Sequence, residues 1–159
     1  MSTARWARIG FALLAWLFLA MAVIQVYLAG SSVSNLGGSG SFELHRNVGY
    51  IIDVVALVLL VLSFAGRLPV RMIGASALLL GQMVLQSVLV FMRTGSPNIA
   101  ALHPLNGFLI GLVALWLAWR SLGYIRAPLP IETPRPEPAP AALPFSRSDR
   151  PDPEEEQSG

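Results

Sequence analysis

The chain contains only two histidines, and they occupy matching places in two similar stretches. The first stretch begins at His45 and reads HRNVGYIIDVVALVLLVLS. The second begins at His103 and reads HPLNGFLIGLVALWLAWRS. Aligned without a gap, they also place Gly49 on Gly107. Apolar residues match easily between helices, so the repeated His-x-x-x-Gly motif is the stronger evidence for a repeat. It predicts a duplicated unit that places one imidazole at the same height in each half.

Two imidazoles at equivalent positions indicate metal chemistry. Neutral imidazole is a common metal ligand, and a pair facing across a four-helix bundle can bind a haem iron axially. Gly49 and Gly107 lie one turn from the histidines, on the same helix face and roughly 6 Å deeper. A bulky side chain there would collide with a porphyrin. We therefore predict one b-type haem between His45 and His103. The alternative is that the histidines bond to loops and the glycines mark close helix packing.

Four more polar residues lie near the predicted depth of the imidazoles. Gln25 and Gln86 could orient an imidazole through a hydrogen bond or contact the cofactor edge. Arg46 and Arg93 could pair with haem propionates, or could extend toward lipid headgroups instead.

An acidic residue also falls inside a predicted membrane span. Asp53 lies two turns below His45, and Gln82 should reach a similar depth as its partner. Acids within the membrane usually face the bundle interior. Because Gly111 takes the place of Asp53 in the second repeat, a structural, protonated Asp53 is favoured over a proton-relay site.

Composition separates the chain into two regions. Of its residues, 54% are hydrophobic, and none is cysteine, which excludes disulfides, c-type haem attachment and thiolate metal sites. Eight arginines and two acids lie in residues 1–126, against three arginines and seven acids in 127–159. The small net charge averages these two regions, and we expect no nucleic-acid partner.

Hydropathy predicts four membrane-spanning helices, each apolar nearly all round. They cover about residues 9–29, 44–65, 70–92 and 102–124. A cleaved signal peptide is the competing interpretation of the first run, but its length and the three later spans favour a retained helix. The predicted fold class is an all-α integral membrane four-helix bundle built from a duplicated two-helix hairpin, over residues 1–126. Residues 127–159 hold nine of the twelve prolines and are predicted to be a disordered cytoplasmic tail.

Arginine positions predict the orientation. Six arginines flank the ends on the N-terminal side, whereas only Arg46 and Arg93 lie on the other. The positive-inside rule therefore predicts a multi-pass protein of the plasma membrane with both termini in the cytoplasm.

Several motifs resemble one four-helix half of the haem A synthase family. They are Gln25-x4-Gly30, Gly38-Ser39-Gly40, Glu43-Leu44-His45-Arg46 and His103. The resemblance implies paired histidines on the second and fourth helices that bind a haem near the outer side. This chain departs from the family in having one four-helix unit, no cysteine pair, and Glu43 two rather than three residues before His45. It is closer overall to small four-span bacterial membrane proteins, a resemblance that implies a fold but no activity.

The functional prediction is a bis-histidine haem protein for electron transfer or haem handling, with a quinone or a redox protein as partner. Two alternatives remain open. One is a cofactor-free accessory subunit of a larger membrane complex, and the other is a small proton-coupled transporter that uses Asp53.

Overall fold

A computed structural model describes residues 2–34 and 41–126, and all of its regular structure is helical. The helices are α1 (Thr3–Val33), α2 (Glu43–Ala65), α3 (Val70–Phe91), α4 (Pro97–Ala100) and α5 (His103–Ile125). The predicted all-α four-helix bundle is confirmed, with α1, α2, α3 and α5 as its long helices. The predicted disordered tail lies outside the described residues.

The helices differ from the predicted spans at two places. α1 begins six residues earlier than predicted and continues to Val33, beyond the predicted end of the first span at about residue 29. The hydroxyl of Ser32 donates to the Leu28 carbonyl at 2.8 Å. This bond satisfies the serine hydroxyl within the last helical turns. The turn after α3 contains the short helix α4, in which Pro97 occupies the first turn.

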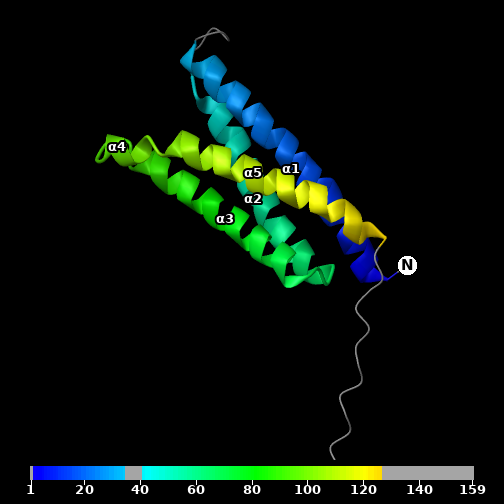
Figure 1. Cartoon of the computed structure of the whole chain (residues 1–159). Coiled ribbons are helices and arrows are strands. Elements are labelled where there is room, and N and C mark those ends of the chain that lie inside the picture. Colours follow the sequence, from blue (N-terminus) through cyan, green and yellow to red (C-terminus); the bar gives the residue numbers. More distant parts are fainter. Residues whose placement is uncertain (1, 35–40, 127–159) are drawn as a thin grey trace, which may run out of the picture.

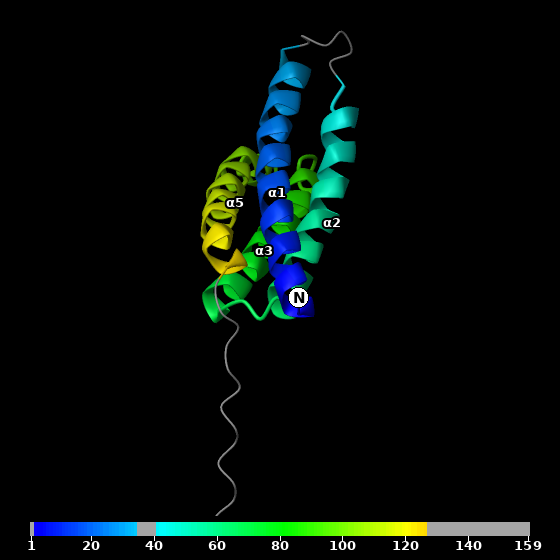
Figure 2. The same cartoon turned by 90° about the vertical axis from the view of Figure 1, so that its right-hand side faces the viewer.

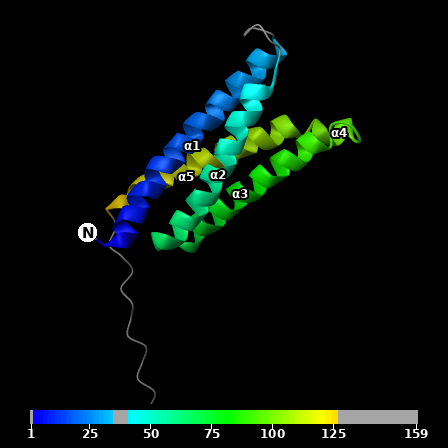
Figure 3. The ribbon, with the colours of Figure 1, turned by 180° about the vertical axis from the view of Figure 1, so that it is seen from behind.

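Each long helix packs against two others in a closed ring, so that α1 contacts α2 and α5, and α3 also contacts α2 and α5. The helices that carry the histidines, α2 and α5, are therefore diagonal partners. Figure 1 shows α5 crossing between the two ends of the bundle beside α1 and α3, and Figure 3 shows α2 and α3 side by side from behind. In Figure 2 the N-terminus, the end of α5 and the α2–α3 connection share one end.

The buried positions repeat between the two hairpins. On α2 and α5, the buried residues match at a constant offset: Ile52 and Ile110, Ala56 and Ala114, Leu59 and Leu117, Ser63 and Ser121. On α1 and α3 a second constant offset pairs Phe11 with Met72, Ala15 with Ser76 and Phe18 with Leu79, all of them buried. We call α1 with α2 the first half, and α3 to α5 the second half. The core is thus built from two copies of one unit, related as parallel repeats.

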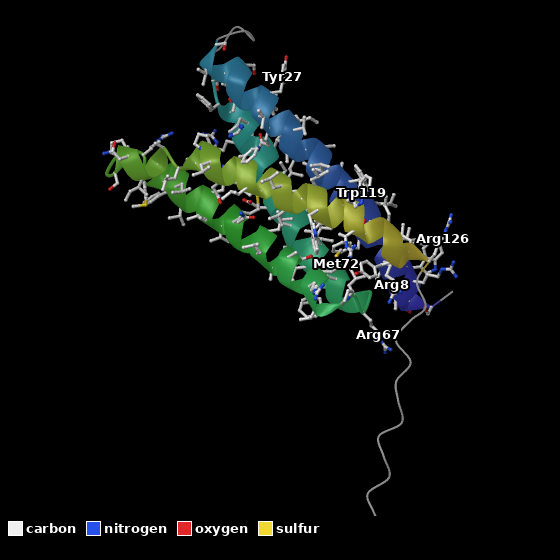
Figure 4. The ribbon with its side chains drawn as sticks, viewed as in Figure 1. Arg8, Tyr27, Arg67, Met72, Trp119 and Arg126 are labelled. Carbon is white, nitrogen blue, oxygen red and sulfur yellow. The ribbon has the colours of Figure 1, made fainter. Side chains whose placement is uncertain are left out.

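The outer surface of the bundle suits a lipid environment. Four helices are long and apolar enough to cross a membrane, and only 17–22% of the apolar stretch of each is buried inside the bundle. Many large hydrophobic side chains therefore face outward, including Trp119, which is 69% exposed on α5 (Figure 4). Such a surface would aggregate in water, and the chain is a multi-pass membrane protein.

A Schellman motif closes α2 and sets the tight return into α3. Arg67 has φ 49°, the left-handed conformation that usually favours glycine after a helix. The Arg67 amide donates to the Phe64 carbonyl at 2.9 Å, and the Leu68 amide donates to the Ser63 carbonyl at 3.0 Å. Leu68 is buried against the core, and Pro69 is the N-cap residue of α3. This connection fixes the antiparallel packing of α2 on α3.

Leu59 and Leu117 occupy equivalent, fully buried core positions. We expect Leu59→Ala and Leu117→Ala each to reduce the free energy of unfolding by about 2–4 kcal/mol, since each leaves a cavity. Thermal unfolding in mild detergent measures the loss. Leu57→Ala is the matched control, because Leu57 is 51% exposed. An equal loss in the control would contradict the assigned core.

Candidate functional site

In the first half, Gln25 of α1 and His45 of α2 bond to each other twice. The Gln25 side-chain amide donates to the backbone carbonyl of His45 at 2.9 Å. The Nδ1 of His45 lies 3.2 Å from the backbone carbonyl of Gln25. A carbonyl oxygen can only accept, so His45 carries its proton on Nδ1. Both residues are only part-buried, at the end of the hairpin where α1 gives way to α2.

In the second half, Gln86 of α3 and His103 of α5 repeat this arrangement. The Gln86 side-chain amide donates to the backbone carbonyl of His103 at 3.1 Å. His103 Nδ1 donates to the backbone carbonyl of Gln86 at 3.4 Å. The amide nitrogen of Gln86 also lies 3.1 Å from His103 Nε2 and donates to it. That last contact has no counterpart among the bonds that the described residues form to His45.

The glycines below each histidine make room for these glutamines. A Cβ at Gly49 would lie 3.2 Å from the Gln25 amide nitrogen, and a Cβ at Gly107 would lie 3.4 Å from that of Gln86. The distance at Gly49 is tighter than most side-chain contacts, and that at Gly107 lies at the lower edge of ordinary van der Waals contact. The sequence-based interpretation gave this space to a porphyrin. In the structure a glutamine amide occupies it, so each His-x-x-x-Gly motif works together with a glutamine on the neighbouring helix.

The two imidazoles meet across the bundle. Their ring centres are 6.2 Å apart and their planes are inclined by 64°. Because Nδ1 of each neutral ring donates to a backbone carbonyl, each Nε2 carries the lone pair that could bind a metal, and in this structure the Nε2 of His103 accepts from the Gln86 amide. Two imidazoles that bind one metal ion at about 2 Å have ring centres roughly 6 Å apart. The ring separation is therefore the one expected for two ligands of one iron, and His103 Nε2 would have to leave the Gln86 amide to bind it.

The site offers few protein ligands to a metal ion. Within residues 2–34 and 41–126, no group of three or more histidine, cysteine, aspartate or glutamate side chains is placed to bind a metal ion. A bare zinc ion would need three or four protein ligands. A haem requires only axial ligands, because the porphyrin supplies the equatorial nitrogens. Two histidines, such as His45 and His103, would be enough to fill the axial positions of a haem.

Asn106 was not predicted as a site residue, and it is buried one residue before Gly107. Its side-chain amide donates to the Gln86 side-chain oxygen at 2.7 Å and to the Gln82 backbone carbonyl at 2.9 Å. In the first half Val48 stands at the equivalent position, and the side-chain oxygen of Gln25 is buried with no hydrogen-bond partner. An asparagine inside an apolar span is the signal that could have identified this residue.

The remaining predicted site residues lie away from the imidazoles or make no bond to them. Arg46 and Arg93 are exposed at the end of the bundle that carries the histidines. Asp53 is part-buried on α2 and makes no hydrogen bond to Gln82 or to any other described residue. The side-chain oxygen of Gln82 is itself buried without a partner. The structure therefore does not join Asp53 and Gln82 as the sequence analysis expected.

At the end of the bundle opposite the histidines, Arg8 of α1 forms hydrogen bonds to the ends of α2 and α5. This residue was counted only as a flanking charge, but it is 4% exposed. Its Nε donates to the Gly66 carbonyl at 2.8 Å, and its Nη1 donates to the Tyr124 carbonyl at 3.4 Å. These carbonyls lie in the last turns of α2 and α5, where no intrahelical donor is available. Figure 4 shows Arg8, Arg67 and Arg126 at this end, and Tyr27 toward the other end of α1.

Comparison with known protein families found a match over part of the chain. A family of unknown function (DUF6220) matches residues 25–95, or 71 of the 159 residues. The matched segment includes Gln25, His45, Gly49 and Gln86 and ends before His103. The searches of curated proteins and of solved structures each found no match.

The contact between each glycine and its glutamine predicts how substitutions act on the protein without any cofactor. Gly49→Leu and Gly107→Leu should each reduce the free energy of unfolding by about 1–3 kcal/mol, because the new side chain displaces the amide. Gly111→Ala is the control, since no atom lies within 4 Å of its Cβ position. It should be neutral or gain up to about 1 kcal/mol from helix propensity. Melting in detergent distinguishes the variants, and unchanged stability in both leucine variants would refute the packing role.

Proposed function

We propose that this protein binds one b-type haem, with His45 and His103 as the two axial ligands. The single observation that supports the proposal is the meeting of the two imidazoles at 6.2 Å, each with its Nδ1 hydrogen bonded to a backbone carbonyl. Such hydrogen bonds orient metal-binding histidines and raise their basicity. The haem would supply the redox chemistry, and the chain would supply orientation and an apolar surrounding.

Under this proposal the work of the protein is electron transfer or the handling of haem. With both axial positions filled by histidine, the iron has no open site for a substrate, which favours electron transfer. The partner would be a quinone within the bilayer or a redox protein at its surface. Arg46 and Arg93 are exposed at the same end of the bundle and are available to propionate carboxylates.

A second candidate function is a cofactor-free subunit of a larger membrane complex. The reciprocal glutamine–histidine bonds join the helices of each half without any metal, and the glycines fit the glutamine amides. Polar bonds of this kind contribute to helix association in membranes. A transporter that uses Asp53 has less support, since no described residue is bonded to that carboxyl group.

The proposed location is the plasma membrane with both termini in the cytoplasm. Because Arg8 is buried and bonded to helix ends, five arginines remain to flank the N-terminal side, against Arg46 and Arg93 on the other. The arginine bias is still in favour of a cytoplasmic N-terminal side. The haem would then lie near the outer boundary of the membrane.

Protein purified in mild detergent should take up one equivalent of hemin and give a low-spin spectrum whose Soret band shifts and sharpens on reduction with dithionite. His45→Ala and His103→Ala should each abolish the six-coordinate, low-spin form, because each removes one axial ligand. Optical titration with hemin measures both effects. Ile110→Leu is the control, since it conserves volume. A wild-type protein that stays colourless and rejects hemin would exclude the proposal and leave the packing subunit.

The topology is tested by reporter fusions at two points. A reporter active only in the cytoplasm should be active when fused after Arg126 and inactive when fused at Gly38. The fusion at Gly38 places the reporter in the α1–α2 connection, at the end that carries the histidines. Activity at Gly38 alone would invert the orientation and place both imidazoles at the inner boundary.

A further inference from the structure

The two halves differ at one point that bears directly on the imidazoles. In the second half the Gln86 amide nitrogen donates to His103 Nε2 at 3.1 Å. In the first half, none of the described residues donates to His45 Nε2, and the Gln25 amide reaches only the His45 backbone carbonyl. The nitrogen that would bind iron is therefore already hydrogen bonded in one histidine and available in the other.

The cause of this difference is Asn106, which lies on α5 three residues after His103. Asn106 holds the Gln86 side-chain oxygen at 2.7 Å and is anchored to the Gln82 carbonyl at 2.9 Å. With its oxygen fixed, the Gln86 amide presents its nitrogen to His103. Val48 takes the place of Asn106 in the first half and cannot make these bonds, which leaves the Gln25 oxygen buried and unpartnered.

We infer that His45 is the permanent axial ligand and His103 is a displaceable one, restrained by Gln86 and Asn106. To bind iron, His103 must give up the hydrogen bond from Gln86, whereas His45 gives up nothing. A small neutral ligand would accordingly compete with His103, and not with His45, for the iron of a bound haem. This inference rests on the proposed haem site and extends it from electron transfer to the binding of a small ligand such as a diatomic gas. Gln86 and Asn106 act as positioning residues, since neither would touch the iron.

The test uses hemin-loaded full-length protein, reduced with dithionite and titrated with carbon monoxide. His103→Ala should retain hemin as a five-coordinate, high-spin form and bind carbon monoxide readily, while His45→Ala should lose hemin affinity by at least about tenfold more. Asn106→Val copies the first half. By freeing His103 Nε2 it should weaken carbon monoxide binding by about tenfold and raise the low-spin fraction. Val48→Asn copies the second half, and should restrain His45 and reduce hemin affinity.

Each outcome separates the inference from the proposed function. If the wild type binds no hemin, the haem site and the inference both fail. If the wild type binds hemin but His45→Ala and His103→Ala lose it equally, only the inference fails. The same holds if Asn106→Val leaves the carbon monoxide affinity unchanged. Melting temperatures measured without hemin identify any variant that is simply unfolded. If Asn106→Val is unfolded, the hemin spectrum of Val48→Asn tests the inference. If Val48→Asn is unfolded, the spectrum of Asn106→Val tests it.

Discussion

The structure depends on a reciprocal pair of hydrogen bonds, formed once in each half, between a glutamine and a histidine on neighbouring helices. The glutamine side chain donates to the histidine backbone carbonyl, and the histidine ring donates to the glutamine backbone carbonyl. The glutamine side-chain amide and the histidine ring N–H need such acceptors within a membrane helix bundle, because lipid offers none. Each bond pair joins the two helices of its half and fixes the protonated nitrogen of the ring. A glycine one turn below admits the glutamine, so three residue types are constrained together.

The ring of four long helices turns these two local arrangements into one site. α2 and α5 are diagonal, and each packs against both α1 and α3. Equivalent buried residues below the histidines, from Ile52 and Ile110 to Ser63 and Ser121, hold these two helices at matching depth. At the far end the buried Arg8 satisfies carbonyls of both α2 and α5. Polar groups thus join the helices at both ends of the bundle, while the core between them is mostly apolar.

Much of the fold was predictable from the sequence, because long apolar runs in a membrane have few alternatives to helices. The repeat of α2 and α5 was also visible, since two histidines and two glycines fall in register. The matching repeat of α1 and α3 was hidden, because the connection from Gln25 to His45 is three residues longer than that from Gln86 to His103. Asn106 and the buried role of Arg8 were missed for a different reason. Their importance comes from bonds between helices, and hydropathy carries no information about such bonds.

The central claim is that one iron is bound by both histidines, and magnetic resonance of the ferric protein loaded with hemin tests it most directly. The chain has only two histidines, so isotopic labelling of histidine nitrogen marks those two imidazoles alone. The account predicts a low-spin signal with strong hyperfine coupling to two labelled nitrogens. In His45→Ala or His103→Ala that coupling should come from one nitrogen. A wild-type signal coupled to one labelled nitrogen, or to none, would contradict the claim.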